Sequence, residues 1–127
     1  MRTFGIGTDI VKISRIKNLL KKKLFLKRIF DKEEVYKCEK NTNYINCFAK
    51  RFAAKEAFSK ALGTGITNGI NFNEITILNE KNGKPFIKLI NRTKKIVEKK
   101  LKKKNYKIYL SLADEKDYAV AFVTILI

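Results

Sequence analysis

The chain has 127 residues, of which 45% are hydrophobic, which is enough to bury a core and excludes a disordered basic tail. Its formal net charge of +17 favours anionic partners: nucleic acid, membranes, phosphorylated metabolites or acidic proteins. The absence of histidine excludes every mechanism with a histidine base or metal ligand, so a proton must pass through carboxylate, Lys, Tyr or water.

The chain is expected to begin with a strand and helices. TFGIGTDIV (3–11) suits a short strand that runs into a turn. Ser14 is expected to cap a helix through RIKNLLKK (15–22). The amphipathic stretch LFLKRIF (24–30) is compatible with a continuation of this helix.

A second group of helices follows in the middle of the chain. Asp31 and Glu34 have the spacing of a capping box, which predicts a fresh helix start. After a loop around residues 41–43 comes the strongest helical segment, which ends where Gly63 and Gly65 permit a left-handed backbone.

The C-terminal half is predicted to be mostly strands. Asn82-Gly83 is a hairpin turn signal, 91–104 is a Lys-coated helix, and 113–117 is an acidic turn. The strand-like runs are EITIL (74–78), PFIKLI (85–90), YKIYLSL (106–112) and YAVAFVTILI (118–127). The sequence therefore predicts an α+β fold, with a mainly antiparallel sheet packed by helices, in a single domain spanning residues 1–127.

Two further expectations concern location and redox state. The N-terminal residues include Asp9 and two glycines where a signal peptide needs an apolar stretch, and no apolar run approaches the roughly 20 residues of a membrane span. We therefore expect a cytoplasmic protein that starts at Met1 and has no membrane partner. Cys38 and Cys47 are expected to be reduced thiols, since no zinc-type pair exists.

The segment RFAAKEAFSKALGTG (51–65) carries the most chemistry. At 100° per residue it divides into two arcs. One arc holds Ala53, Ala54, Ala57, Phe58, Ala61 and Leu62, and so many alanines imply close packing against a neighbour. The other, polar arc holds Phe52, Lys55, Glu56, Ser59, Lys60 and Gly63, while Arg51 is out of phase with it.

Two interpretations of this segment remain open at this point. Glu56 and Lys60 form either an ordinary surface ion pair or part of a phosphate site, and the glycine turn is either a simple cap or a ligand contact. Asp9 is either a turn residue or a second carboxylate, and two carboxylates with phosphate oxygens are a typical Mg²⁺ ligand set. Spacing does not show whether Asp9 and Glu56 meet.

A family resemblance favours the phosphate site. GIGTDIV, RFAAKEAFSKALGTG, NGKPFI and SLADEKDYAVAFV occur in the order typical of the holo-[acyl-carrier-protein] synthases, the small phosphopantetheinyl transferases. The resemblance covers Phe4 to Val123. It implies transfer of 4′-phosphopantetheine from coenzyme A to a serine of apo acyl carrier protein, with release of adenosine 3′,5′-bisphosphate, for fatty-acid biosynthesis.

The resemblance also implies roles for individual residues. Asp9 and Glu56 match the ligands of Mg²⁺, with Mn²⁺ as an alternative, and Lys60 joins them as a catalytic group that contacts phosphate. The coenzyme A pocket is implied by positions that match Arg51, Lys60, Gly63, Thr64, Gly65, Asn82, Gly83, Lys84 and Pro85.

The expected assembly is a homotrimer with active sites between subunits, since this is typical of the family. Acyl carrier proteins are acidic and dock on the first helix, which implies contacts with Arg15, Lys21, Lys22 and Arg28. The identity of the carrier and the extent to which the lysine excess serves function are left open by the sequence.

One departure from the family pattern concerns the proton acceptor. Many relatives have Ser-His where this chain has Ala113-Asp114, so a histidine contact is excluded. Asp114, Glu115 and a metal-bound water remain alternatives, and an acidic turn that caps the last hairpin is equally compatible.

Two other functions are compatible with parts of the sequence. An RNA-binding protein is favoured by the charge and by the Lys-rich 94–104 segment, but no aromatic RNA-binding motif is present and nucleic acid is not an expected partner. A transferase for carrier domains of larger synthases is disfavoured by the short length.

Overall fold

The computed structural model describes residues 1–63 and 69–127. Helices alternate with antiparallel strands, as the sequence predicts, and the α+β fold class is confirmed. In chain order the elements are β1 (Thr3–Lys12), α1 (Ile13–Leu19), α2 (Lys23–Ile29), α3 (Lys32–Glu39), α4 (Tyr44–Leu62), η1 (Phe72–Glu74), β2 (Ile75–Asn79), β3 (Pro85–Leu89), α5 (Asn91–Leu101), β4 (Lys107–Asp114) and β5 (Tyr118–Leu126).

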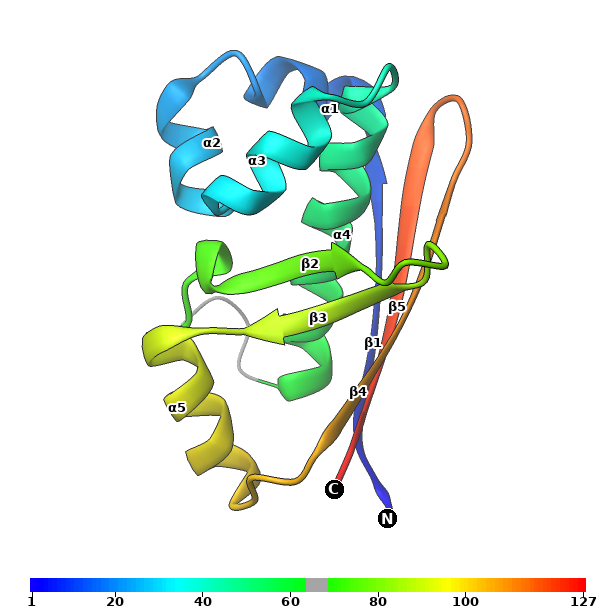
Figure 1. The fold of residues 1–127 in the computed structure, drawn as a ribbon. Coiled ribbons are helices and arrows are strands. Elements are labelled where there is room, and N and C mark those ends of the chain that lie inside the picture. Colours follow the sequence, from blue (N-terminus) through cyan, green and yellow to red (C-terminus); the bar gives the residue numbers. More distant parts are fainter. Residues whose placement is uncertain (64–68) are drawn as a thin grey trace.

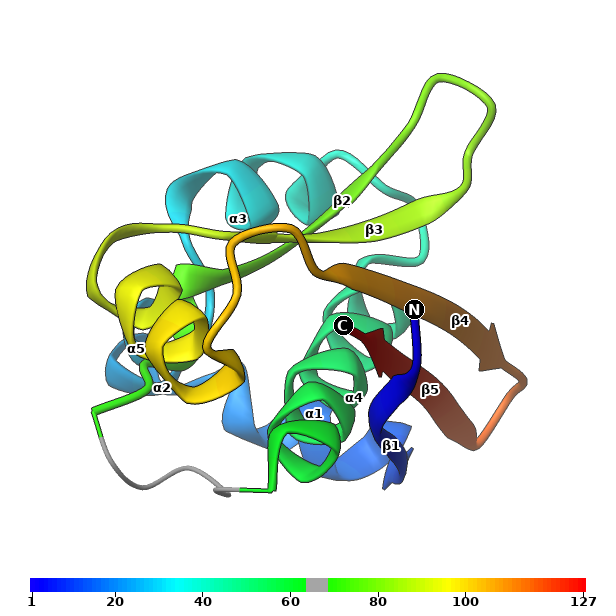
Figure 2. The ribbon, with the colours of Figure 1, turned by 90° about the horizontal axis from the view of Figure 1, so that it is seen from below.

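The core lies between α4 and an antiparallel sheet in which β5 is flanked by β1 and β4. Figure 1 shows the long strands of this sheet at the right, and Figure 2, from below, shows α4 between the sheet and α5. Alternate residues of β5 are buried, as expected of a strand with one face against a helix. These residues are Ala119, Ala121, Val123 and Ile125.

Small residues let α4 lie directly on β1. A Cβ on Gly5 would overlap the carbonyl oxygen of Ala61, and a Cβ on Gly7 would overlap that of Ala57. The backbones are therefore in contact where a side chain would separate them. This confirms the close packing expected from the alanines of the helix.

The helix α4 is also enclosed on its other side by α3, η1 and β2, which the wheel did not predict. Phe52, Lys55 and Ser59 were predicted on a polar arc, yet all are buried, so that part of the prediction is wrong. The ammonium of Lys55 donates to Glu34 Oε1 at 2.7 Å, to the Phe72 carbonyl at 2.7 Å and to the Ile75 carbonyl at 2.6 Å. These contacts use all three ammonium protons and make burial of the charge tolerable.

The capping box at the start of α3 is confirmed. Asp31 Oδ1 accepts from the Glu34 amide at 2.9 Å, and Glu34 Oε1 accepts from the Asp31 amide at 3.2 Å. Glu34 Oε2 accepts from the Ile77 amide at 3.0 Å, so the same carboxylate joins α3 to β2 and α4.

Three predictions about the N-terminal residues are wrong. No turn interrupts β1 at Asp9, because the strand pairs with β5 through to Lys12. Ser14 does not cap α1, because the helix begins one residue earlier, at Ile13, and Ser14 lies within its first turn. The Ile13 amide donates to the Asp117 carbonyl. The segment 24–30 does not continue that helix, because turns at residues 20–22 separate α1 from α2.

The expectation of reduced thiols is also wrong. Cys38 in the last turn of α3 and Cys47 in the first turn of α4 form a disulfide. The short loop at residues 40–43 folds back and brings the two helix ends together, a non-local contact that residue spacing does not reveal.

The C-terminal elements follow the prediction closely. The β2–β3 hairpin turns at Gly83, which has a φ of 92°, and Asn82 Oδ1 accepts from the Lys84 amide at 3.0 Å. Helix α5 and strands β4 and β5 lie in the expected segments, but their bounds differ from the prediction. Helix α5 ends at Leu101 and not at residue 104, because Lys102 has a left-handed backbone. Ala113 and Asp114 belong to β4 rather than to the acidic turn, and Glu74 belongs to η1 rather than to β2. In the described ranges, no helix combines the length and apolar character that a bilayer crossing requires.

Candidate active site

Asp9 and Lys60 meet where β1 crosses α4. Lys60 Nζ lies 3.2 Å from Asp9 Oδ1 and donates to the Thr8 carbonyl at 3.0 Å. The Asp9 side chain is 17% exposed and that of Lys60 is 55% exposed, so the ammonium lies at the rim of the contact. The close approach of β1 to α4 therefore brings an acid and a base from residues 51 positions apart into one ion pair.

Glu56 lies one helical turn before Lys60 and shares this corner. Burial raises the pKa of Glu56, the negative charge of Asp9 raises it further, and the charges of Lys60 and Arg15 lower it. The fold thus brings the two predicted carboxylates close enough to repel each other. Such a pair is compatible with a divalent cation that takes its other ligands from water and phosphate.

The surface ion pair considered for Glu56 and Lys60 is not formed. Among the ion pairs of the described residues, Lys60 contacts Asp9 and not Glu56. Two of the three ammonium protons are donated to the Thr8 carbonyl and to Asp9, so one proton is left for a further acceptor such as a ligand oxygen.

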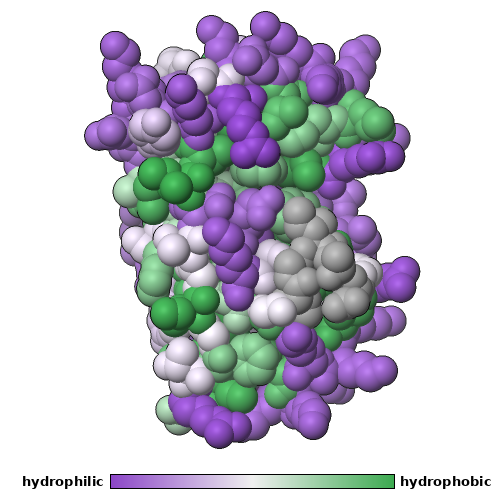
Figure 3. All heavy atoms as spheres, turned by 180° about the vertical axis from the view of Figure 1, so that it is seen from behind, coloured by the Kyte–Doolittle hydropathy of each residue, from purple (hydrophilic) through white to green (hydrophobic). Residues whose placement is uncertain are grey.

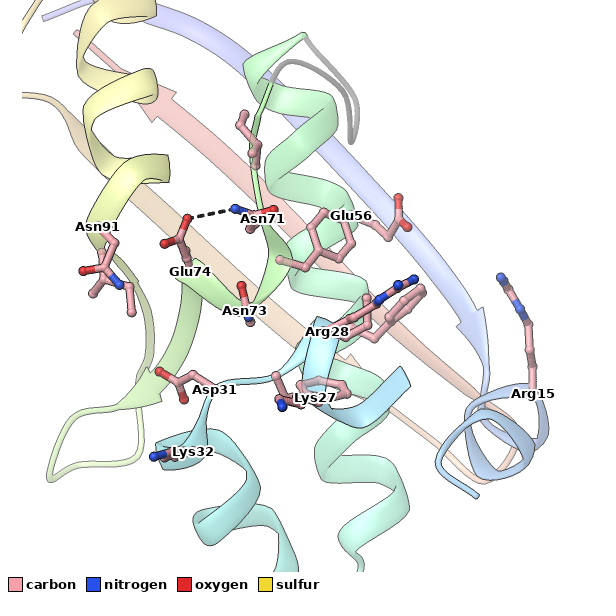
Figure 4. Close-up of a pocket in the computed structure, with 16 residues that line it drawn as sticks. Arg15, Lys27, Arg28, Asp31, Lys32, Glu56, Asn71, Asn73, Glu74 and Asn91 are labelled. Carbon is pink, nitrogen blue, oxygen red and sulfur yellow. Dashed lines mark hydrogen bonds between the residues drawn. The ribbon is translucent and has the colours of Figure 1, made fainter. Parts of the chain in front are cut away.

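A cleft of about 960 Å³ opens beside Glu56. Figure 4 shows Glu56, Arg28 and Arg15 on one side of it, with Asn71, Glu74 and Asn91 on the other. The Arg15 guanidinium carbon lies 5.9 Å from the centre of the Phe52 ring in the wall. The remaining lining residues are Lys27, Ile29, Phe30, Asp31, Lys32, Ile70, Phe72, Asn73 and Ile90.

The asparagines of this cleft were not predicted from the sequence. Asn71 donates to Glu74 Oε1 at 3.3 Å, and Glu74 also accepts from Thr93, which lowers its pKa against the effect of burial. The only available signal was the polar INFNE stretch (70–74), for which no structure was predicted before the strand expected to begin at Glu74.

Arg51 lies away from the cleft. It is 4% exposed, and its guanidinium donates to the carbonyl of Cys47 at 3.4 Å, to the sulfur of Cys47 at 3.1 Å and to Asn79 Oδ1 at 3.1 Å. Burial lowers the pKa of Arg51, while the charge of Glu34 opposes this shift. Helical geometry predicted no role for Arg51 on the face of Glu56, and the structure agrees.

The hairpin turn forms a second, smaller pocket of about 380 Å³. Gly83, Lys84 and Pro85 line it together with Lys50 and Asn79 from α4 and β2, and with residues 110–112 of β4. Asn82 shapes the turn through its bond to the Lys84 amide and is not among the lining residues. Within one chain, the residues predicted to bind coenzyme A therefore lie in two separate places, one at the corner of Asp9 and Lys60 and the other at the hairpin.

The glycine turn after α4 is described only in part. Gly63 has a φ of 85° and its amide donates to the carbonyls of Ser59 and Lys60, so it is a left-handed helix cap as predicted. Thr64 and Gly65 lie outside the described residues.

Basic side chains surround the upper part of the molecule. Arg15 and Arg28 line the cleft beside Glu56, whereas Lys21 and Lys22 lie in the turn between α1 and α2 and do not line it. Figure 3 shows hydrophilic side chains gathered at this end, where Figure 1 places α1, α2 and α3.

Asp114 is held by α4. Its Oδ2 accepts from Asn46 Nδ2 at 2.7 Å and its Oδ1 lies 3.5 Å from Lys50 Nζ. Glu115 contributes its backbone carbonyl to Asn46 at 3.4 Å. These contacts agree with an acidic turn that anchors the last hairpin.

Comparisons with known proteins agree with this architecture. Residues 5–123 match the model of the 4′-phosphopantetheinyl transferase superfamily. A holo-[acyl-carrier-protein] synthase of Pelagibacter ubique is 47% identical over 123 residues, covering 97% of this chain and 96% of that protein. The crystal structure of the synthase from Neisseria meningitidis superimposes with a TM-score of 0.86 at 37% identity and covers 98% of both chains. The Helicobacter pylori synthase in complex with coenzyme A gives a TM-score of 0.79 at 31% identity and covers 94% of this chain and 98% of that one.

Proposed function

Because the chain belongs to the 4′-phosphopantetheinyl transferase superfamily, we propose that it is a holo-[acyl-carrier-protein] synthase. It transfers 4′-phosphopantetheine from coenzyme A to a serine of apo acyl carrier protein, in the cytoplasm and for fatty-acid biosynthesis. The observation that carries the proposal is the ion pair of Asp9 with Lys60 where β1 crosses α4, with Glu56 one helical turn before Lys60 and within the influence of the Asp9 charge. That corner holds two carboxylates and an ammonium beside a cleft of about 960 Å³.

In the proposed reaction the serine oxygen bonds to the phosphorus next to the pantetheine, and the bond from that phosphorus to the bridging oxygen breaks. Adenosine 3′,5′-bisphosphate leaves with that oxygen, and the serine loses its proton. The third N–H group of Lys60 donates a hydrogen bond to a phosphate oxygen and so orients the pyrophosphate. The proton acceptor remains open between Glu115 and water, since Asp114 is engaged by Asn46 and Lys50.

The carboxylates of Asp9 and Glu56 fit a divalent metal. Burial raises the pKa of Glu56 and the negative charge of Asp9 raises it further, and a bound cation would relieve the repulsion between the two carboxylates. We propose that they hold Mg²⁺, which when bound neutralises charge on the pyrophosphate. Mn²⁺ is the alternative, because it accepts the same oxygen ligands.

Docking of the acyl carrier protein is assigned to the basic surface of α1 and α2. Arg15 and Arg28 line the cleft beside Glu56, so a carrier bound there delivers its serine next to the carboxylates. Lys21 and Lys22 extend the positive charge outward, and their effect is on the rate of association.

A homotrimer explains the outer face of the sheet. Ile6, Ile10 and Phe122 are 62%, 64% and 44% exposed, and the strand register puts them on the face opposite α4. Tyr109 and Tyr118 extend this apolar surface at 47% and 41% exposure. An uncovered apolar sheet face is typical of a subunit interface, and we propose that other copies of the chain cover it.

The decisive test is incubation with coenzyme A, Mg²⁺ and apo acyl carrier protein, followed by intact-mass analysis of the carrier. We expect a mass gain of one phosphopantetheine group that EDTA abolishes. Glu56→Gln should remove turnover while the protein stays folded, and Glu33→Gln, with the same charge change on exposed α3, should not. No gain with any acyl carrier protein would exclude the activity, and normal turnover of Glu56→Gln would exclude the metal assignment.

Sites between subunits can be tested by mixing inactive variants. Glu56→Gln removes the carboxylate corner, and Lys84→Glu reverses a charge at the exposed hairpin turn. If one site takes Glu56 from one subunit and Lys84 from another, mixed trimers regain part of the activity that each variant lacks. Light scattering should give three times the 14.7 kDa chain mass. A monomer, or a mixture without recovered activity, would exclude shared sites.

A further inference from the structure

Asn79 joins two groups that the coenzyme A site is proposed to use. Its Oδ1 accepts from Arg51 Nη2 at 3.1 Å, and its Nδ2 donates to the Gly83 carbonyl at 2.9 Å. The residue ends β2, and its side chain therefore ties the guanidinium of α4 to the hairpin turn. Both polar ends of this amide are used.

Arg51 is a buried cation whose charge no carboxylate neutralises directly. It is 4% exposed, and the ion pairs of the described residues do not include it. Its hydrogen bonds go to a backbone carbonyl, a sulfur and the neutral amide of Asn79, and its Nε has no partner within that part of the chain. Buried charges are normally paired, so a guanidinium with only neutral hydrogen-bond partners is an unusual feature that calls for a physical reason.

Asn79 also stands in the wall of the pocket at the turn. That pocket of about 380 Å³ is also lined by Lys50 and Lys84, so two further cations share it with the amide. A neutral acceptor at this place orients Arg51 without cancelling its charge, whereas a carboxylate would cancel it.

We propose that Asn79 is a positioning residue for coenzyme A, one that fixes Arg51 and the Gly83 turn while leaving the guanidinium charge available to a phosphate group. This inference rests on the proposed function, because it assigns the anion to coenzyme A. It concerns affinity for the nucleotide and not the chemical step at Asp9 and Glu56.

Two substitutions separate this role from simple structural support. Asn79→Ala removes both hydrogen bonds, whereas Asn79→Asp keeps an acceptor for Arg51, adds a neutralising charge and loses the donor to Gly83. We expect the melting temperature of Asn79→Asp to equal or exceed that of Asn79→Ala. Coenzyme A affinity should follow the reverse order, with the Kd of Asn79→Asp raised at least about tenfold over wild type, as expected for a lost charge-assisted contact.

The measurements are calorimetric Kd values for coenzyme A, and KM values for coenzyme A and for the carrier. The KM for coenzyme A should rise while kcat and the KM for the carrier stay within about twofold of wild type. Asn105→Asp on the exposed loop before β4 carries the same charge change and should bind coenzyme A normally.

The possible results divide cleanly. Equal coenzyme A affinities for Asn79→Asp and Asn105→Asp, or affinities that follow the melting temperatures, would overturn the inference and leave the proposed function standing. A wild-type chain that binds coenzyme A but transfers nothing would overturn the proposed function alone, because the binding comparison still decides the role of Asn79. A wild-type chain that does not bind coenzyme A would overturn both.

Discussion

Lys55→Met tests the buried ion pair that holds α3, α4 and β2 together. The ammonium contacts Glu34 and two backbone carbonyls, and both charged side chains are fully buried. Methionine fills most of the volume of lysine but leaves the carboxylate of Glu34 buried without its cation. Breaking a buried pair in this way costs about 3–5 kcal/mol, so the free energy of unfolding at neutral pH should fall by that amount.

The stability of Lys55→Met should also depend on pH, in a direction set by the pKa of Glu34. Burial raises the pKa of Glu34 above its ordinary value of 4.5, and Lys55 partly offsets this rise. Without Lys55 the pKa of Glu34 rises further, so the folded state holds the proton more tightly than the unfolded state. The stability of Lys55→Met should therefore fall as the pH increases from 4.5 through the folded-state pKa of Glu34.

Glu34→Gln should show the opposite trend. Burial lowers the pKa of Lys55 below its ordinary value of 10.5, and removal of Glu34 lowers it further. The unfolded state then holds the proton more tightly, so stability rises as the pH increases through the folded-state pKa of Lys55 towards 10.5.

Urea unfolding of both variants at several pH values measures these trends. Lys94→Met on exposed α5 is the matched control and should change stability by less than about 0.5 kcal/mol. The double variant should cost less than the sum of the single changes, because neither charge is then left alone. A loss below about 1 kcal/mol for Lys55→Met, independent of pH, would refute the assignment of a charged pair.

Three more predictions address packing, the disulfide and the carrier surface. Gly7→Ala should lower the free energy of unfolding by about 1–3 kcal/mol or more and reduce turnover, since the added Cβ overlaps the Ala57 carbonyl. Urea unfolding and activity assays measure both effects, and the control Lys12→Ala on the same strand should change neither stability nor turnover. Cys38→Ser should lower the free energy of unfolding by about 2–3 kcal/mol in non-reducing buffer, from the loss of a cross-link between residues nine apart; equal stability of wild type with and without dithiothreitol would count against this. Arg28→Glu should raise the KM for acyl carrier protein about tenfold at low salt, less at high salt, and leave the KM for coenzyme A unchanged; an equal effect from Lys94→Glu on α5 would contradict docking at α2.

Local features of the fold were predictable from the sequence. The capping box of Asp31 and Glu34 and the Asn82-Gly83 turn each depend on residues within four positions of one another. Their hydrogen bonds form wherever the backbone adopts the corresponding turn, so residue type and spacing are sufficient.

Burial and cross-linking were not predictable in the same way. Lys55 was assigned to a polar face because a helical wheel assumes one covered side, whereas α4 is covered on two. The bond between Cys38 and Cys47 and the contact of Arg51 with Asn79 likewise depend on how separate elements pack. Such contacts have no signal in the local pattern.

The proximity of Asp9 to Glu56 was only partly predictable from the sequence. Gly5 and Gly7 on the strand oppose Ala61 and Ala57 on the helix, and both stripes of small residues are visible in the sequence. Small residues two apart on a strand and four apart on a helix each lie on one face, so they can mark two backbones that touch. The alanines alone indicate that the helix packs closely, and the glycines of β1 are needed to identify its partner.

The phase of α4 supports the proposal that active sites lie between subunits. Arg51 and Glu56 are five residues apart, which turns them about 140° from each other around the helix axis. Glu56 faces the cleft beside β1, and Arg51 points to Asn79 and the hairpin. A coenzyme A that contacts both groups within one chain has to span different sides of a buried helix, which is an obstacle to a site made by one copy. Joining the Glu56 corner of one subunit to the Arg51 side of another removes that obstacle, and the apolar outer face of β1 and β5 supplies the surface on which the subunits can meet.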